Sequence, residues 1–201
     1  MPVRIQTAPP EVSEALEVAL FELHDARVED GLELTAPVST TPPFPLLTVQ
    51  GAQVAEGNWL GGMRHVGWRS VVEFADGSFG LADVLLEGER LTLASLSRGA
   101  RTEALLAAAH SLDDGEELPD VDLTVLWAPE IRLSALELRG EGLHAFLPFE
   151  GMPAGFYLVE EFLVASRDYA RGFRDGVLGE WTEDEFEGQD GNGDRGGYNE
   201  G

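Results

Sequence analysis

Alternating apolar residues interrupted by tight turns constrain the fold of this chain more than any other feature. Residues 66–74 are rich in β-branched and aromatic side chains and lead into Asp76-Gly77, a dipeptide that readily takes the positive φ values of a hairpin turn. Residues 79–86 return from this turn, and a second turn at Gly88-Glu89 leads to residues 90–96. Because consecutive strands joined by short turns usually pair, this stretch predicts three antiparallel strands.

A second stretch of the same kind lies between residues 121 and 149. Its three segments are residues 121–127, 131–138 and 143–149, separated by turns at Ala128-Pro129-Glu130 and Gly140-Glu141-Gly142. In the middle segment the apolar positions change face, because Leu133 and Ala135 lie on one side whereas Leu136 and Leu138 lie on the other. This change of phase predicts a β-bulge or a strand buried on both faces.

Three other segments have helical spacing. Residues 10–26 fit either a helix that starts after Pro9-Pro10 or a strand, and we favour the helix. Residues 102–112 are rich in Ala and Leu and stop at Asp113-Asp114-Gly115, which predicts a short helix. From residue 158 to 173 apolar side chains recur every three or four positions, with acids near the start and arginines near the end. A helix dipole favours this charge order, so we expect a helix there.

Together these elements predict an α+β protein with a mainly antiparallel β core of about seven to nine strands, a sandwich or half-open barrel, flanked by two or three helices. We expect Leu32-Glu33-Leu34 to begin a short strand. The segment from Pro37 to Pro45 is expected to be an extended loop, because proline removes the donors of a strand ladder. Residues 1–178 are expected to form one domain, and residues 179–201, rich in glycine and acids, a flexible tail.

The chain contains no lysine and no cysteine in its 201 residues. Without lysine it cannot carry a Walker-type phosphate-binding lysine, a Schiff base or a kinase ion-pair lysine. Without cysteine it has no thiolate nucleophile, no thiol redox pair and no Cys-ligated zinc or cluster. A Gly-x-Ser-x-Gly motif is also absent, so serine hydrolysis has no support. No cofactor is predicted, and we lean toward a protein that is not an enzyme.

The charge balance is strongly acidic. The 37 Asp and Glu face 13 Arg, for a formal charge of −24, of which residues 175–201 contribute −8. Such a field repels the phosphates of nucleic acid and of anionic membranes, so we expect no direct binding to either. The N-terminus has no apolar signal segment, and a soluble, cytoplasmic protein is expected. Adaptation to high salt, or a GC-rich genome that replaces lysine codons, are other origins for this composition.

An acidic stretch is the first candidate binding site. Residues 102–131 hold eight acids and no Arg or Lys. The six candidate residues are Asp113, Asp114, Glu116, Glu117, Asp120 and Asp122. They form either a solvated connection between a helix and a strand or a patch that docks an Arg- or Lys-rich surface.

A glycine-rich segment with two tryptophans is the second candidate. Trp59 and Trp68, together with Arg64, have the composition of an interface hot spot. The alternative is a glycine-rich turn whose tryptophans pack on the core. This region also has balanced charge, so self-association into a homo-oligomer meets the least repulsion there.

Other chemistries leave weaker signals. The tail segment Asp190 to Gly196 resembles the first half of a calcium loop, but Arg195 stands where the sharp-turn glycine is needed. The four histidines, His24, His65, His110 and His144, form no metal-binding pair in sequence. Paired carboxylates suited to hydrolysis can be found in almost any chain with so many acids, so they do not indicate a hydrolase here. No metal site is therefore predicted.

The leading hypothesis is a non-catalytic accessory or adaptor protein that binds a basic protein partner, in its strongest form by imitating the charge of nucleic acid. One alternative is a carboxylate- or metal-dependent hydrolase, in which acids from distant segments converge with His65 or His144 in one pocket. Another is a structural subunit that uses the Trp59–Trp68 region as its contact face.

Overall fold

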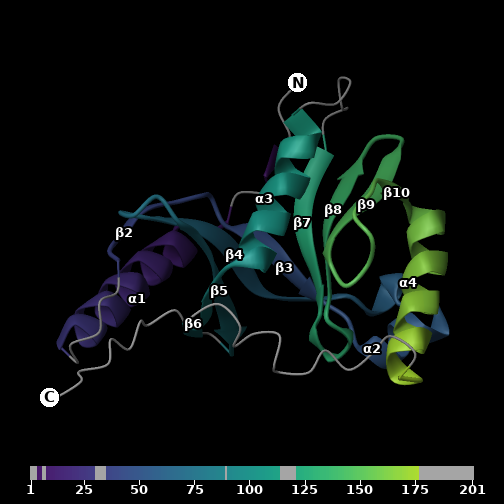
Figure 1. Cartoon of the computed structure of the whole chain (residues 1–201), viewed down its shortest axis with the longest axis horizontal. Helices are drawn as coiled ribbons and strands as arrows, with labels where there is room; N and C mark the ends of the chain where they lie inside the picture. The colour runs from purple at the N-terminus through teal and green to yellow at the C-terminus, as the bar shows by residue number, and fades with distance from the viewer. Residues whose placement is uncertain (1–3, 6–7, 30–34, 89, 114–120, 177–201) are drawn as a thin grey trace, which may run out of the picture.

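Both predicted meanders are present, and they are two halves of one sheet. The computed structural model describes residues 4–5, 8–29, 35–88, 90–113 and 121–176 (Figure 1). In the first meander β4 (Arg64–Phe74), β5 (Phe79–Glu87) and β6 (Arg90–Arg98) pair antiparallel. In the second, β7 (Val121–Ala128), β8 (Leu133–Gly140) and β9 (Leu143–Glu150) do the same. The predicted α+β class with a mainly antiparallel core is therefore confirmed.

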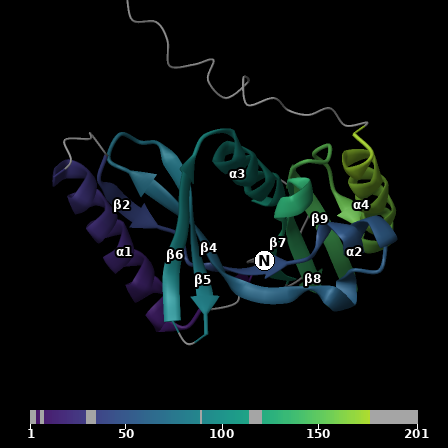
Figure 2. The same ribbon diagram turned by 90° about the horizontal axis from the view of Figure 1, so that it is seen from below.

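A strand that the sequence did not predict joins the two meanders. β3 (Phe44–Thr48) runs antiparallel to β4 and parallel to β7, so the strand order is β10-β9-β8-β7-β3-β4-β5-β6. Three short strands complete the sheet: β1 (Arg4–Ile5) beside β7, β2 (Pro37–Thr40) beside β4, and β10 (Tyr157–Leu158) beside β9. The sheet curves strongly (Figure 2), so of the two expected arrangements a half-open barrel describes it better than a sandwich.

The expected loop from Pro37 to Pro45 is wrong, because this segment contributes β2 and the start of β3. Prolines are tolerated here for a positional reason. Among the described strands β2 pairs only with β4, and the pairing of β3 with β7 begins at Leu46, one residue after Pro45. The missing N–H groups therefore fall on the edge and at the start of strands, where they break no ladder bond.

Four helices cover the two faces of the sheet unequally. α3 (Ala100–Asp113) lies on the face toward which the sheet curves, whereas α1 (Pro10–Glu29), α2 (Gly51–Glu56) and α4 (Val159–Arg174) lie on the other (Figure 2). Two one-turn 3₁₀ helices occur at Leu60–Gly62 and Pro129–Ile131. The predicted helices at residues 10–26, 102–112 and 158–173 are confirmed, and α2 was not foreseen.

Each helix buries its apolar side against a separate part of the sheet. Val12, Leu16 and Leu20, spaced by four residues, are the buried side of α1, and the last two pack on a cluster that includes Val72 and Val84. Leu105 of α3 packs on the opposite face. Phe162 and Ala170 of α4 close the third cluster together with α2. Burial of each large apolar side chain stabilises the folded state by roughly 2 kcal/mol, because it removes apolar surface from water.

Of the two causes proposed for the change of face in β8, burial on both faces is the one observed. All side chains from Leu133 to Leu138 are buried, with Leu133 and Ala135 in one cluster and Leu136 and Leu138 in another. The pairing of β8 with β9 also shifts between Ser134 and Ala135, but the extra residue of this bulge, Phe149, belongs to β9. The expected strand at Leu32-Glu33-Leu34 and the expected tail at residues 179–201 lie outside the described residues. No helix in the described part of the chain is long and apolar enough to span a membrane.

Candidate functional site

A hollow lies at the middle of the sheet, on the face that carries α1, α2 and α4. We call it the central pocket, and its volume is about 570 Å³. Such a volume lies within the range of roughly 300–1,000 Å³ that small-ligand sites occupy. The pocket is lined by Pro9, Pro45, Leu47, His65, Trp68, Asp122, Thr124, Glu137 and Arg139.

Strand alternation places the polar residues of β7 and β8 in this pocket. Leu123 and Leu138 belong to the core on the α3 face of the sheet. Because neighbours along a strand point to opposite faces, Asp122 and Thr124 of β7 and Glu137 of β8 point to the pocket face. The pairing register sets Thr124 opposite Glu137. The site thus follows from the same alternation that builds the core.

Glu137 is the centre of a buried polar network. It is 2% exposed, yet three donors surround its carboxylate. Thr124 Oγ1 donates to Oε2 at 2.7 Å, Arg139 Nη2 donates to Oε1 at 2.8 Å, and His144 Nε2 of β9 lies 2.8 Å from Oε1. A buried carboxylate is tolerated only when it is hydrogen-bonded and its charge is compensated, and these three side chains meet both conditions.

A β-bulge brings His65 and Trp68 to the same side of β4. Residues three apart in a regular strand point to opposite faces. Here Leu46 of β3 pairs with Gly67 while Leu47 pairs with His65, so β4 contains one extra residue at this point. The bulge resets the alternation, and the two rings meet edge to face with centroids 4.5 Å apart. Both rings then line the central pocket.

Glycine is required at the bulge because the neighbouring strand comes very close. A Cβ on Gly67 would lie 2.1 Å from the carbonyl oxygen of Val84 on β5, far inside van der Waals contact. Gly67 therefore allows β5 to pair with β4 at the point where β4 bends. The geometry of the pocket depends on this residue, although its side chain contributes nothing to the lining.

The pocket favours a positively charged occupant. Its two carboxylates, Asp122 and Glu137, outnumber its one guanidinium, Arg139, and Trp68 supplies an aromatic wall. An aromatic ring attracts a cation through its quadrupole, and a negatively charged protein raises the local concentration of cations. The arrangement can hold an ammonium or guanidinium group.

The structure brings together one residue from each of the two predicted binding regions. Asp122 belongs to the acidic stretch and Trp68 to the tryptophan segment, and both line the central pocket. Arg64 is exposed at the start of β4, beside His65. Asp113 is the last residue of α3. Asp114, Glu116, Glu117 and Asp120 lie outside the described residues.

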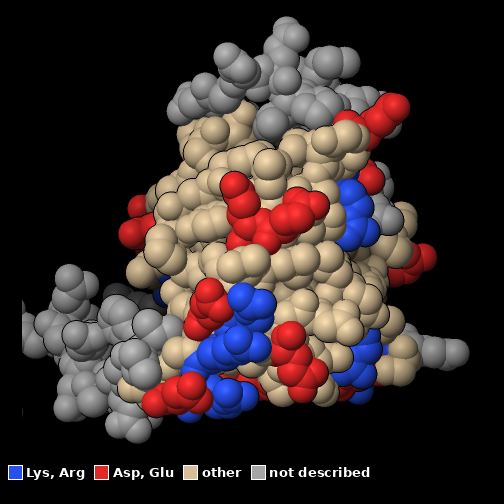
Figure 3. Space-filling model, turned by 90° about the vertical axis from the view of Figure 1, so that its right-hand side faces the viewer, with Lys and Arg blue, Asp and Glu red and all other residues tan. Residues whose placement is uncertain are grey.

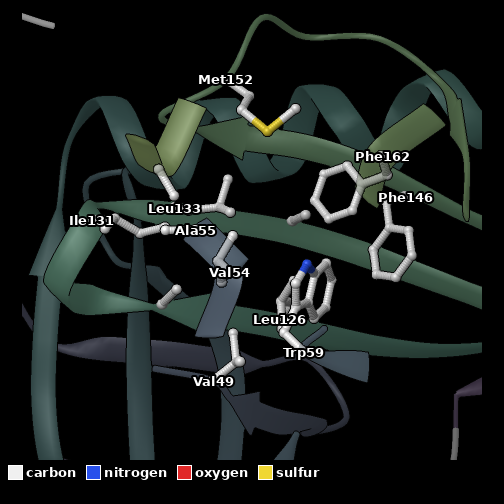
Figure 4. Close-up of a cluster of buried hydrophobic side chains, with 13 residues drawn as sticks. Val49, Val54, Ala55, Trp59, Leu126, Ile131, Leu133, Phe146, Met152 and Phe162 are labelled. Carbon is white, nitrogen blue, oxygen red and sulfur yellow. The ribbon is translucent and has the colours of Figure 1, made fainter. Parts of the chain in front are cut away.

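Trp59 occupies the core and not the surface, as in the alternative interpretation of the glycine-rich segment. Its exposed fraction is 0%, and its indole meets Phe146 and Phe162 edge to face at 5.9 and 5.8 Å (Figure 4). The two phenylalanines stack on each other at 4.2 Å. Trp59 thus fixes α4 and the segment after α2 to the sheet, and only Trp68 of the pair is available to a ligand.

Sequence reasoning missed the residues that organise the pocket, namely Thr124, Glu137 and Arg139. Two signals were present. Glu137 interrupts a run of otherwise apolar or small residues from Leu133 to Leu138, and Gly67 interrupts a β-rich segment. A charged residue in a buried strand and a glycine inside a strand both indicate a special local environment.

The charged side chains on the α4 side of the molecule are mixed in sign (Figure 3). Along α4 and just after it, Arg167 pairs with Asp168 and Arg174 with Asp175, both at 3.2 Å. Imitation of nucleic acid requires ordered rows of carboxylates without intervening cations. The described residues on this side do not form such a row.

Asp122, Glu137 and His65 line the pocket, and His144 contacts Glu137, so part of the convergence expected for a hydrolase is present. However, no group of three or more His, Asp or Glu side chains within the described ranges is placed to hold a metal ion. The carboxylate of Glu137 is also occupied by three donors. Its position suits a fixed negative charge better than a group that exchanges protons with a substrate.

Comparison of the chain with protein families, with curated proteins and with solved structures finds no match. The functional argument therefore rests on the geometry and charge of the central pocket.

Proposed function

We propose that this protein is a non-catalytic interaction protein that binds a basic protein partner and takes one arginine or lysine side chain of that partner into the central pocket. The observation that carries the proposal is that Asp122, Glu137 and Trp68 all line one hollow of about 570 Å³. Carboxylates combined with an aromatic wall are the groups that recognise an organic cation.

Each lining residue has a distinct part in this binding mode. Asp122 is exposed and would form the ion pair with the incoming cation, while Trp68 would contact its flat face or its methylene groups. Glu137 is buried and fixed by its donors, so it would contribute a stationary negative charge beneath the ligand. Arg139 offsets only one of the two carboxylates, which leaves the lining with a net negative charge.

The remaining acidity of the protein supports the same partner class. A field of −24 charges accelerates the approach of a basic surface and repels an acidic one. Electrostatic attraction of this kind sets the association rate more than the final affinity. The pocket would then supply the specificity that a diffuse negative charge lacks.

The test is a titration of the full-length protein with an arginine-rich and a lysine-rich peptide, followed by calorimetry. Asp122→Asn and Trp68→Ala should each weaken binding about tenfold, since each removes an interaction worth roughly 1–2 kcal/mol. Glu17→Gln is the matched control. Glu17 is an exposed acid on α1 outside the pocket, so its loss changes the net charge equally but should alter affinity less than twofold.

Equal effects of Asp122→Asn and Glu17→Gln would show that only the overall charge matters and would reject the pocket. A pull-down from native lysate at low and moderate salt then identifies the partner. Capture of acidic or nucleic-acid partners would contradict the proposal.

A carboxylate-dependent hydrolase is the second candidate, favoured by Asp122, Glu137 and His65, which line one pocket. Its distinguishing result would be turnover of a test ester or glycoside that Glu137→Gln abolishes without unfolding the protein. Binding of a basic peptide without turnover supports the first proposal instead.

A further inference from the structure

A second hollow lies on the opposite face of the sheet, beside α3. We call it the apolar groove. It has a volume of about 810 Å³ and runs between α3, the end of β9 and the segment 151–156 that follows β9. Its walls include Ala108 and Leu112 of α3, Phe149 of β9, and Met152 and Phe156 of the following segment. None of the described residues that line it is charged.

The groove exposes apolar surface that the described residues leave uncovered. Phe156 is 49% exposed although its neighbours in the groove are apolar. An exposed aromatic ring at the mouth of an apolar groove provides a contact for an apolar side chain. The groove and the central pocket lie on opposite faces of the sheet and share no lining residue.

The last helix of the described chain, α4, approaches the segment that borders this groove. Met152 lines the groove and also belongs to the core cluster against which Phe173, near the end of α4, packs. Tyr169 of α4 approaches the same segment, since a Cβ on Gly151 would lie 2.8 Å from its hydroxyl oxygen. Both views place α4 beside the half of the sheet that contains β9 (Figures 1 and 2).

The residues that follow Gly176 have the chemistry to fill an apolar groove. Val177, Leu178, Trp181 and Phe186 are large apolar side chains in the first part of a segment that is otherwise mainly polar, acidic and glycine-rich. An extended chain advances about 3.3 Å per residue, so Trp181 reaches up to roughly 17 Å from Gly176. Large apolar residues in a segment too polar to form its own core gain free energy by docking on an existing apolar surface.

We propose that the chain's own segment from Val177 to Phe186 docks in the apolar groove, with Leu178 and Trp181 as its apolar anchors. Glu180, the acid between these anchors, would stay in solvent. The groove is then an intramolecular docking site, and the docked segment covers its apolar surface without a partner protein.

The absence of cysteine makes a direct test possible. In the full-length protein, Ala107→Cys places one thiol on the groove side of α3, and Thr182→Cys places another beside Trp181. Because the natural chain has no other thiol, any disulfide reports this one contact. We expect a disulfide within one molecule, at a rate independent of protein concentration.

The matched control keeps both cysteines and adds Leu178→Ser and Trp181→Ser. If the apolar anchors hold the segment in the groove, disulfide formation should slow at least tenfold in this variant. Equal rates would overturn the proposal, because they would show only random encounters of a tethered segment. Disulfide-linked dimers whose yield rises with concentration would assign the groove to a second copy and would also overturn it.

A measurement without cysteines guards against disturbance of α3 by the substitution. Hydrogen exchange of residues 104–112 should be faster in the Leu178→Ser/Trp181→Ser variant than in the natural chain, with β4 and β5 unchanged as an internal reference. Unchanged exchange over α3 would reject the docking. Neither result depends on Asp122 or Trp68, so failure here is distinguishable from failure of the cation pocket.

Discussion

Glu137 is the residue at which the sheet departs from an ordinary apolar core. Its neighbours in β8 are buried and apolar or small, and a carboxylate at this position would be costly without Thr124, Arg139 and His144 around it. Trp59 is the opposite case: an unusual sequence environment surrounds a side chain that simply fills the core. Local composition thus draws attention to residues without telling a site from a structural role.

Removal of the Glu137 carboxylate should destabilise the protein. Glu137→Ala takes the shared acceptor away from Thr124, Arg139 and His144, and because Arg139 is 58% exposed and can be solvated, we expect a loss of about 1–3 kcal/mol. Glu137→Gln has nearly the same shape and keeps an acceptor oxygen, so it should cost less. Urea unfolding of the two variants measures the difference. Equal losses would mean that the network contributes packing only.

Asp76 should make the β4–β5 hairpin sensitive to acid. The Ser78 hydroxyl and backbone N–H, followed by the Thr35 hydroxyl and Arg98, hold the pKa of Asp76 at about 2, below its ordinary value of 3.8. The folded state therefore favours the carboxylate, and this stabilisation is complete above about pH 4 and is lost as the pH falls toward 2.

Thermal unfolding of Asp76→Asn across this pH window checks the linkage. The variant should unfold at a lower temperature than the natural protein at pH 7, and the gap should close between pH 4 and pH 2. Ser78→Ala should reproduce most of the effect, since Ser78 is the main cause of the shift. A gap that stays constant with pH would contradict the assignment.

At the scale of the elements, a strand was predictable from the sequence when its pairing partner lies nearby along the chain, and not when the partner lies far away. The hairpins of β4–β5–β6 and β7–β8–β9 have turn residues that report pairing locally, so they were predicted. β3 pairs with a strand about eighty residues later, as in the pair of Leu46 and Val125. The residues next to β3 in the sequence do not indicate this pairing. The central pocket was not predictable for the same reason, because it needs β4 and β7–β8 on either side of β3.

The bulge in β4 links the fold to the site, and Gly67 tests that link. Gly67→Ala would push a methyl group against the Val84 carbonyl and should cost about 1–3 kcal/mol or more, as overpacking does. The displaced strand should also weaken binding of a basic peptide, because His65 and Trp68 lose their common face.

Gly77→Ala provides a comparison at a turn where a Cβ would meet no atom within 4 Å. It should destabilise through its positive φ of 80° while leaving peptide affinity unchanged. If both variants bind equally well, the bulge does not shape the pocket.

At the scale of the whole molecule, the composition predicted the absence of thiol and lysine chemistry and the sign of any attractive partner. It did not predict where the charge acts. The described acids are spread over helices, strands and turns, and only the pairing register brings Asp122 and Glu137 together. The same diffuse charge has a physical consequence for the folded state, since like charges repel most when the chain is compact.

Stability should accordingly increase with salt. Raising sodium chloride from 10 to 500 mM shortens the screening distance severalfold, and the urea midpoint should rise. A variant with Glu14→Gln, Glu17→Gln and Glu22→Gln removes three exposed acids from α1 and should show a smaller rise. An identical rise of the urea midpoint in both proteins would show that electrostatic self-repulsion does not cause it.

The position of β3 between the meanders affects the order in which the strands of the sheet pair during folding. Each meander closes through short connections and can form early, whereas the joint between β3 and β7 must enclose about eighty residues and carries a larger entropic cost. The two halves are then expected to exist briefly with the facing edges of β3 and β7 open. During synthesis, β7 leaves the ribosome long after β3 and β4, so this nascent chain passes through a stage at which an unfinished edge can capture the wrong strand.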